Sequence, residues 1–382
     1  MKNLGLYLHI PFCESKCFYC DFVSFRKTNE DKLKYVHSLI NEIEYKSNKL
    51  KEYEIDTIFI GGGTPSCMPK GSFIEIFNKL RMSLNINKNC EITIEANPNT
   101  ITKDFLNEIK ECGVNRISIG LQSSNDNLLK QINRIHTKQD FLNAVDLIKN
   151  YDFKNINVDL MIGLPNQTLD DVKESIELVK DKVTHISCYG LILEETTKLY
   201  DMVLSKQVSL PSEEDSNKMY DLAYKLLKKY GFERYEVSNF AKYGYMCKHN
   251  LKYWGRAEYI GLGLNASSFI DNKRYSNEIN FNKYLKDFYD INNINCEKLN
   301  YEELSTNDEI NELIMLNLRT KFGLDVNFLK DKYNYDILEN KQVQIDKLIK
   351  NKLIEIKDNC IKVTNQGYYV LNQIILELML DE

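Results

Sequence analysis

The sequence predicts an α/β protein, in which a partial (β/α)6 barrel is followed by a smaller α+β carboxyl-terminal lobe. Two observations carry this prediction. Six short apolar runs of strand length alternate with segments of helical periodicity over roughly the first 200 residues. Four prolines also lie just past the carboxyl ends of these runs, and in parallel sheets those ends share one edge, where ligands bind.

Six strands are expected at 4–10, 56–60, 91–96, 116–120, 157–162 and 185–193, with helices between them, the first two near 29–50 and 71–84. Strand–helix–strand connections are right-handed, so these strands should run parallel and curl into a full or partial barrel. The four prolines are Pro11, Pro65, Pro98 and Pro165. Ligand sites in such folds lie at the carboxyl ends of the strands, so we expect the chemistry there.

The pattern changes after residue 211. A helix near 212–230, a strand over 234–240, a loop over 241–256 and a Gly-rich turn at 261–263 are expected. Three helices and a hairpin over 353–363 then resemble a winged helix. Residues 300–382 hold 10 Lys or Arg against 15 Asp or Glu, which argues against nucleic-acid binding. We expect three units: a barrel over 1–210, an extension over 211–299 and a terminal lobe over 300–382.

Composition excludes several classes of protein. The chain has 382 residues, 43% of them apolar, and a net charge of −5, which gives no electrostatic drive toward nucleic acid or anionic lipid. No apolar run approaches the roughly 18 residues that span a bilayer. The amino terminus lacks the pattern of a signal peptide. We therefore expect a cytoplasmic protein whose membrane contact, if any, is peripheral.

Three of the ten cysteines, Cys13, Cys17 and Cys20, lie within eight residues. Zinc is one alternative, but it usually takes four ligands in two pairs, and no second CxxC follows. Three thiolates on one short loop suit a [4Fe-4S] cluster that keeps one iron without a protein ligand. We expect the cluster.

Polar residues and glycines stand at or near the ends of the expected strands. Each has an ordinary alternative, such as a tight turn, a helix cap or a surface group, so only their joint appearance suggests a ligand site. These residues are Gly62, Gly63, Thr64, Glu95, Gln122, Arg134 and Asp159.

The CxxxCxxC loop directly after the first strand, with an aromatic residue before its last cysteine, resembles the radical S-adenosylmethionine (SAM) superfamily. YxHxPFC at 7–13, GGGTPS at 61–66, EANP at 95–98 and GVNRISIGLQS at 113–123 resemble its coproporphyrinogen III oxidase-like branch. The resemblance implies that SAM binds the open iron and that Tyr7 and Tyr19 join the pocket. It also implies that one electron from the cluster can release a 5′-deoxyadenosyl radical from SAM.

Two activities occur in this branch. The coproporphyrinogen III dehydrogenases carry a fourth cysteine two positions after the third, where this chain has Phe22, and a long extension before the first strand, where this chain has six residues before Tyr7. Both departures disfavour the dehydrogenase, which stays as the enzymatic alternative.

The segment 249–254 matches the HNxxYW motif of the heme chaperones in the branch. The expected heme residues are His249, Asn250, Tyr253 and Trp254. An imidazole is a good axial ligand for heme iron. The structural alternative is that His249 and Trp254 merely pack between two lobes. We expect a chaperone that passes heme to an acceptor protein, with an electron donor for the cluster and without obligatory turnover of SAM.

Overall fold

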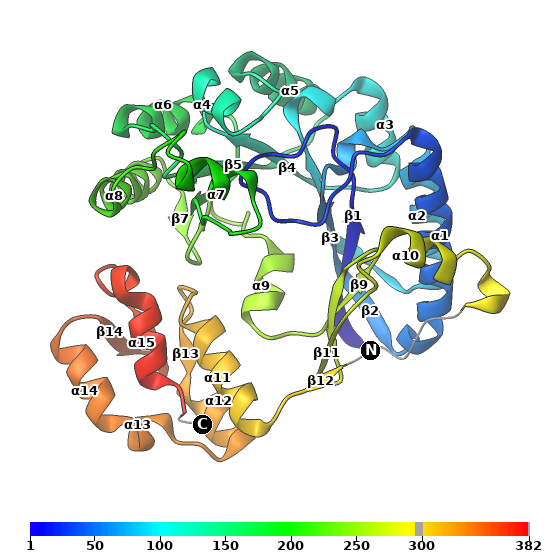
Figure 1. Cartoon of the computed structure of the whole chain (residues 1–382). Coiled ribbons are helices and arrows are strands. Elements are labelled where there is room, and N and C mark those ends of the chain that lie inside the picture. Colours follow the sequence, from blue (N-terminus) through cyan, green and yellow to red (C-terminus); the bar gives the residue numbers. More distant parts are fainter. Residues whose placement is uncertain (295–300, 381–382) are drawn as a thin grey trace.

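The computed structural model describes residues 1–294 and 301–380. Six strands pair in parallel in chain order and curve into a partial barrel, as predicted (Figure 1). They are β1 (Lys2–Ile10), β2 (Tyr53–Gly62), β3 (Ile86–Ala96), β4 (Arg116–Gln122), β5 (Asn155–Ile162) and β6 (His185–Gly190). No helix in these two ranges is long and apolar enough to cross a membrane.

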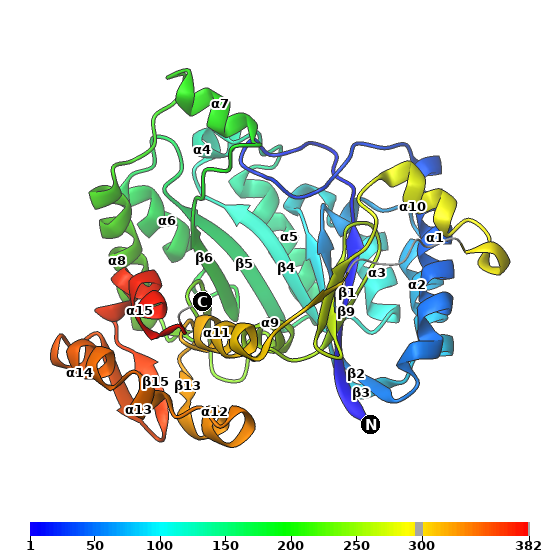
Figure 2. The same cartoon turned by 60° about the horizontal axis from the view of Figure 1, so that its bottom comes forward.

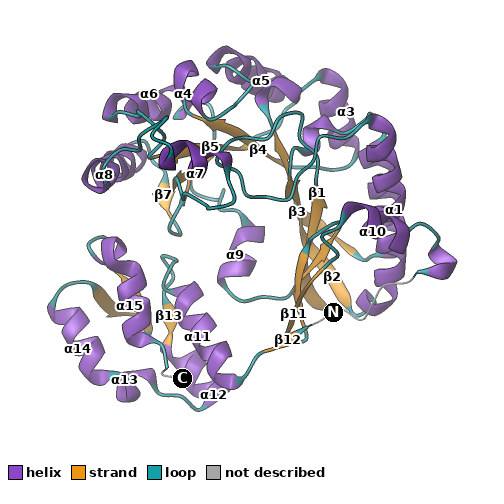
Figure 3. Cartoon of the chain, viewed as in Figure 1, coloured by secondary structure: helices purple, strands orange, loops and turns teal. Residues whose placement is uncertain are grey.

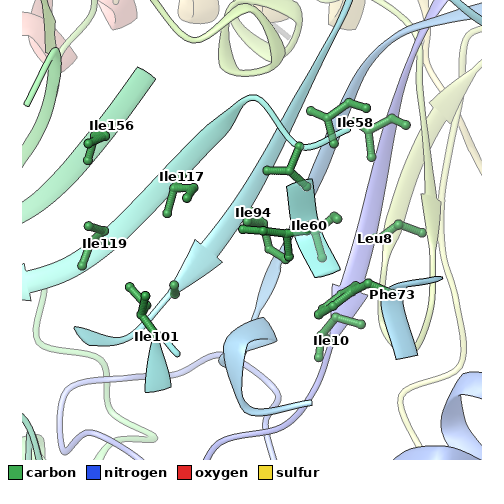
Figure 4. Close-up of a cluster of buried hydrophobic side chains, with 14 of the residues drawn as sticks. Leu8, Ile10, Ile58, Ile60, Phe73, Ile94, Ile101, Ile117, Ile119 and Ile156 are labelled. Carbon is green, nitrogen blue, oxygen red and sulfur yellow. The ribbon is translucent and has the colours of Figure 1, made fainter. Parts of the chain in front are cut away.

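The strands alternate between apolar side chains on one face and polar or small ones on the other. Leu8 and Ile10 of β1 are buried in one cluster between the sheet and the helices, together with isoleucines of β2 to β5 such as Ile58, Ile94, Ile117 and Ile156 (Figure 4). The intervening positions include Thr57, Arg116 and Asn157, which belong to the opposite face because successive strand residues alternate in direction. The interior of the barrel is therefore polar.

Helices cover the outer face of the sheet (Figure 3). Several begin at threonine caps, and Thr137 and Thr168 form reciprocal capping boxes with Asp140 and Asp171. The helices of the barrel are α1 (Asn29–Ser47), α2 (Ser72–Ser83), α3 (Lys103–Glu111), α4 (Asp126–Gln131), α5 (Lys138–Asn150), α6 (Leu169–Val179), α7 (Lys198–Leu204) and α8 (Glu213–Lys229).

The segment 211–294 adds strands to both edges of the sheet. The predicted strand over 234–240 was wrong: two short strands, β7 (Glu233–Arg234) and β8 (Asn239–Ala241), form a hairpin beside β6. The predicted loop over 241–256 was also wrong, because Lys248–Trp254 form the helix α9. At the other edge, β9 (Tyr259–Leu262) pairs in parallel with β1 and is followed by β10 (Ser267–Ile270), β11 (Lys273–Ser276) and α10 (Phe281–Asp287).

The last edge strand, β12 (Glu302–Glu303), leads into a separate apolar core in the carboxyl-terminal lobe. In chain order its helices stand before, between and after the strands of a three-stranded sheet, which gives the predicted α+β lobe (Figure 2). The elements are α11 (Thr306–Asn317), β13 (Leu324–Asp325), α12 (Val326–Tyr333), α13 (Ile337–Asn340), α14 (Gln342–Lys350), β14 (Ile354–Lys357), β15 (Cys360–Val363) and α15 (Leu371–Leu378). The predicted boundary at 299–300 lies outside the described residues.

A buried carboxylate fastens the added edge to the barrel. Glu42 of α1 is completely buried and accepts hydrogen bonds from the backbone N–H of Gly263, the amide of Asn277 and the hydroxyl of Tyr284, each at 2.7 Å. Its charge is balanced by Lys46, 2.7 Å away and also buried. Removing one partner of such a pair leaves an uncompensated buried charge.

We expect Glu42→Gln to lower the free energy of unfolding by about 3 kcal/mol, because Lys46 then keeps its charge without a counterion. Glu44→Gln on the same helix is the matched control. Glu44 pairs with Lys79 at 2.6 Å, but its side chain is 49% exposed, so the loss should stay below about 1 kcal/mol. Urea unfolding of the three proteins measures both values, and equal losses for the two variants would contradict this account.

Candidate functional site

A cavity of about 350 Å³ opens at the carboxyl ends of the barrel strands. Its volume lies in the range of small-molecule sites. Eleven of the residues predicted for the cluster and SAM line it: Cys13, Cys17, Tyr19, Cys20, Gly62, Gly63, Thr64, Glu95, Gln122, Arg134 and Asp159. The structure thus brings these eleven residues together around one cavity.

Tyr7 is the predicted residue that does not line the cavity. Its hydroxyl lies 3.0 Å from Nδ1 of His9, and its ring stacks near that of Phe59. His9 in turn lies 3.2 Å, through Nε2, from the carbonyl of Val23 in the cysteine loop. Tyr7 therefore supports the base of the loop through His9 in this conformation.

The cysteine loop is held at both ends by backbone hydrogen bonds. The N–H of Phe25 donates to Pro11, and that of Cys13 donates back to Phe25. Cys13 Sγ lies 3.5 Å from Thr64 Oγ1, and Cys17 Sγ accepts from Arg134 Nη1 at 3.5 Å. Across the described residues, no three His, Cys, Asp or Glu side chains converge closely enough to hold a metal ion in this conformation.

Two thiols of the loop, those of Cys13 and Cys20, are protonated at neutral pH in this conformation. Burial raises the pKa of Cys13, and burial likewise raises the pKa of Cys20 to about 11. A thiol must lose its proton to bind iron, so metal binding at this loop releases protons.

Gly62 and Gly63 leave room for the cysteine loop at the end of β2. A Cβ atom on Gly62, whose φ is 110°, would overlap the ring of His9, and one on Gly63 would overlap the backbone of Phe12. The backbone N–H groups of Gly63 and Thr64 also donate to the carbonyls of Ile10 and Phe12. The glycines thus let the cysteine loop pack against the end of β2, and they line the cavity as well.

Arg134 is part of the cavity wall. It donates to the carbonyl of Gly120 and, at 2.8 Å, to Asn97 Oδ1, while its buried Nε has no hydrogen-bond partner. Asn97 donates to Thr64 Oγ1 at 3.0 Å and so fixes the arginine relative to the cysteine loop. A guanidinium that lines the cavity beside the Cys17 thiol fits a ligand that carries a carboxylate. Asn97 lines the cavity and belongs to the EANP motif, but it was not among the predicted site residues.

Two carboxyl groups line the cavity opposite the loop. Burial, followed by the nearby charge of Asp159, raises the pKa of Glu95 to about 8, although the N–H of Gly62 donates to it at 3.2 Å. Burial also raises the pKa of Asp159, which accepts from Asn157 Nδ2 at 2.8 Å. Glu95 is therefore largely protonated at pH 7 and would ionise when a cationic group approaches it.

The remaining wall comes from the inward positions of β4 to β8. Gln122 has a φ of 69° and accepts a hydrogen bond from the hydroxyl of Tyr189 at 3.1 Å. Sequence reasoning missed several polar wall residues, which the alternation of the strands could have indicated. They are Ser118, Ser187, Tyr189, Ser238 and Asn239.

The HNxxYW motif does not reach this cavity. It forms α9, which packs against the first half of β2, whereas the cysteine loop lies beyond the strands' other ends (Figure 2). Thr57, which contacts His249, and Gly62, which lines the cavity, are five residues apart on β2, or roughly 16 Å at the rise of a strand.

His249 is buried, with 1% of its surface exposed, and both ring nitrogens are engaged. Nδ1 lies 2.8 Å from Thr57 Oγ1, and Nε2 lies 2.8 Å from the hydroxyl of Tyr253. Burial, aided by the charges of Lys252 and Arg116, lowers the pKa of His249 to about 3. The imidazole is therefore neutral but has no free nitrogen in this conformation.

The other motif residues are less enclosed. Asn250, Tyr253 and Trp254 are half-buried, and the carbonyl of Trp254 accepts from Asn317 of α11 at 2.9 Å. Lys252 pairs with Asp56 of β2 at 2.8 Å. The helix thus lies between barrel and lobe, as the structural alternative for this motif required.

The buried His249 should make the protein less stable in acid. The unfolded chain binds a proton near pH 6.5, whereas the folded chain binds it only near pH 3, so stability falls as pH drops below 6.5. For this residue we expect a loss of about 2 kcal/mol between pH 7 and pH 5. Urea unfolding at both pH values should show a loss smaller by that amount in His249→Asn; an identical loss in both proteins would contradict the lowered pKa.

Comparison with known proteins gives two family matches. Residues 7–179 match the Radical SAM superfamily, and residues 304–370 match the HemN C-terminal domain. Among solved structures, the coproporphyrinogen III oxidase HemN from Escherichia coli superimposes with a TM-score of 0.85 over 99% of this chain and 90% of its own, at 21% identity. That likeness establishes the fold.

Two of the curated relatives match over nearly the whole length, and a third matches over about seven tenths. The chain is 34% identical to the heme chaperone HemW of Lactococcus lactis subsp. lactis (strain IL1403), over 100% of this chain and 98% of the relative. It is 31% identical to the protein of the same name from Bacillus subtilis (strain 168), over 96% and 97%. It is 43% identical to that of Buchnera aphidicola subsp. Schizaphis graminum (strain Sg), over 71% of each. With identity of this extent, the chain belongs to the HemW family of radical SAM proteins.

Proposed function

We propose that this protein is a heme chaperone, which binds heme and transfers it to an acceptor protein. The observation that carries the proposal is the full-length identity with relatives named heme chaperone HemW, including 34% over the entire chain in Lactococcus lactis. The site supports it, because the sequence retains both the three-cysteine loop and the HNxxYW segment.

The cavity residues fit a cluster and SAM. Cys13, Cys17 and Cys20 would hold a [4Fe-4S] cluster, Arg134 would pair with the carboxylate of SAM, and Glu95 would accept from its amino group. Asp159 and Tyr19 would contact ribose and adenine, while Gln122 and Thr64 complete the wall. When bound, the cluster supplies an electron that can cleave SAM. An electron-donor protein must then reach the cysteine loop.

Phe22 favours the chaperone over the dehydrogenase. It stands two positions after Cys20, where the dehydrogenases of the branch carry a further cysteine, and its side chain is 62% exposed at the cavity rim. Phenylalanine offers neither a ligand nor a proton at that position. Coproporphyrinogen III dehydrogenation remains the alternative function.

The heme ligand that we propose is Nε2 of His249. In the described conformation this nitrogen is bonded to the hydroxyl of Tyr253, so heme binding requires Tyr253 to move away while Thr57 continues to hold Nδ1. Asn250 and Trp254 would then flank the porphyrin. We further propose that this transfer takes place in the cytoplasm, with membrane contact limited to the periphery.

Tyr253→Phe should bind heme more tightly than the wild type, because no hydrogen bond to Nε2 of His249 has to be broken before heme binds. A net hydrogen bond of about 1 kcal/mol corresponds to roughly fivefold in the heme dissociation constant. Anaerobic titration of the cluster-loaded protein with hemin, followed in the Soret band, measures the change. Weaker binding by Tyr253→Phe would show that the hydroxyl contacts heme rather than guarding the imidazole.

His249→Ala is the companion variant in the same titration. It should lose the shifted Soret band, whereas Lys248→Ala, at the exposed neighbouring position, should keep it. An unchanged complex in His249→Ala would remove the ligand assignment. Conversion of coproporphyrinogen III to protoporphyrinogen IX by the same sample, with SAM and reductant, would favour the alternative function.

SAM binding should depend on the ionisation of Glu95. The empty site has a Glu95 pKa of about 8, and an amino group beside it lowers that pKa, so binding releases a proton and strengthens as pH rises toward 8. Each pH unit below 8 should weaken SAM binding by up to about tenfold through this residue.

Glu95→Gln isolates this contribution, because the amino group of SAM itself titrates near pH 8. The ratio of the two proteins' SAM dissociation constants, measured by equilibrium dialysis at pH 6.5 and pH 8, should favour the wild type more at pH 8. A ratio that is the same at both values would mean that Glu95 does not meet the amino group.

A further inference from the structure

Polar side chains fill the barrel between the cavity and α9. Interiors of barrels of this type are usually packed with branched apolar residues. Here Thr57, Thr93, Arg116, Asn157 and His185 are all buried on the strands β2 to β6. Buried polar groups lower stability unless they are hydrogen-bonded, so the pattern of their bonds is informative.

One line of these bonds runs from the cavity to α9. Asp159, in the cavity wall, accepts from Asn157 Nδ2 at 2.8 Å. Asn157 Oδ1 lies 2.6 Å from His185 Nδ1, and His185 Nε2 lies 2.8 Å from the hydroxyl of Tyr235. That hydroxyl accepts from the backbone N–H of Cys247 at 3.2 Å, and Cys247 caps the amino end of α9.

The donors in this line all point the same way. Asn157 Oδ1 can only accept, so His185 must carry its proton on Nδ1. Burial lowers the pKa of His185 well below its usual value, so the ring has one proton and Nε2 accepts from Tyr235. Every donor therefore faces toward Asp159, and bonds aligned in this way polarise one another.

A second contact links the end of the line to His249. Glu91, buried on β3, accepts from the backbone N–H of His249 at 3.1 Å and lies 3.6 Å from Cys247 Sγ. Tyr235 and Glu91 together hold the first turn of α9. Tyr235 is thus in direct contact with the turn that carries the proposed heme ligand.

We propose that Asn157, His185 and Tyr235 are positioning residues that couple ligand binding at Asp159 to the position of α9, so that SAM and heme change each other's affinity. This inference rests on the proposed function. A ligand hydroxyl that donates to Asp159 weakens that carboxylate as the acceptor for Asn157, and the aligned bonds carry the change to Cys247. Coupling of two binding equilibria is reciprocal, so either ligand reports it.

The test compares the heme dissociation constant with and without saturating SAM, in cluster-loaded anaerobic protein. We expect the two constants to differ by about tenfold in the wild type, within the usual range of coupling. Tyr235→Phe removes only the bridging hydroxyl, and the ratio should fall to about one. The reciprocal measurement, SAM affinity with and without heme, should give the same ratio.

Tyr284→Phe is the matched control, because Tyr284 is equally buried but donates to Glu42 outside the barrel interior. It should keep the wild-type ratio, and circular dichroism should show each variant folded. If Tyr235→Phe does not fold, Asn157→Leu, of similar size, breaks the line elsewhere and should also bring the ratio to one.

The outcomes separate this inference from the proposed function. Absence of heme binding by the wild type would overturn the proposed function itself. Binding of both ligands with a wild-type ratio of one would overturn only the coupling. A wild-type ratio kept by Tyr235→Phe or Asn157→Leu, or lost in Tyr284→Phe, would also overturn the role of these residues.

Discussion

The polar interior of the barrel is the constraint on which the rest of the structure depends. Each strand turns its isoleucines and leucines outward against the helices, so its alternate side chains must face inward. Many of those side chains are polar, and the burial of a polar group costs free energy unless it finds a hydrogen-bond partner. The cysteine loop closes one end of this interior, and α9 closes the other. The cysteine loop and α9, which are the two proposed binding segments, thus cover opposite ends of the same polar interior.

This constraint also explains why neither ring nitrogen of His249 is free to bind a ligand in this conformation. An imidazole beside Thr57 and Phe59 would be costly to bury without bonds at both nitrogens, and Tyr253 supplies the second one. The same bond blocks the nitrogen that the proposed ligand role requires. The imidazole of His249 must be neutral both when it accepts the hydrogen bond from Tyr253 and when it would bind iron. Burial lowers the pKa of His249 and so keeps it neutral. Exchange of the tyrosine hydroxyl for iron therefore needs movement of one side chain and no change of protonation.

The sequence predicted what depends on local pattern. The six strands and the cavity at their ends follow from periodicity and from prolines, and parallel strands bring Glu95, Gln122 and Asp159 to one edge. It did not predict α9, a seven-residue helix that is marginal alone and is held by Glu91 and Tyr235. The short edge strands β7 to β12 were missed for the same reason.

Long-range partners account for the remaining differences. The burial of His249 depends on Thr57, 192 residues away in the chain. Position 62 needs a glycine because the ring of His9 packs against it. Asn97 belongs to the site because it accepts a hydrogen bond from Arg134. A single sequence shows which residue types are present, but it does not show which of them meet.

The separation of the two ends bears on the choice between carrier and enzyme. A substrate attacked by a radical from SAM must enter the cavity beside the cysteine loop. Heme bound at Nε2 of His249 would instead lie at the far end of the interior, roughly 16 Å along β2 from Gly62. The two proposed binding segments thus stand at different positions along β2, whereas reacting atoms must approach to about 3.5 Å. This separation favours the proposed function, in which SAM would act on heme through the protein, over a reaction in which both ligands meet in one cavity.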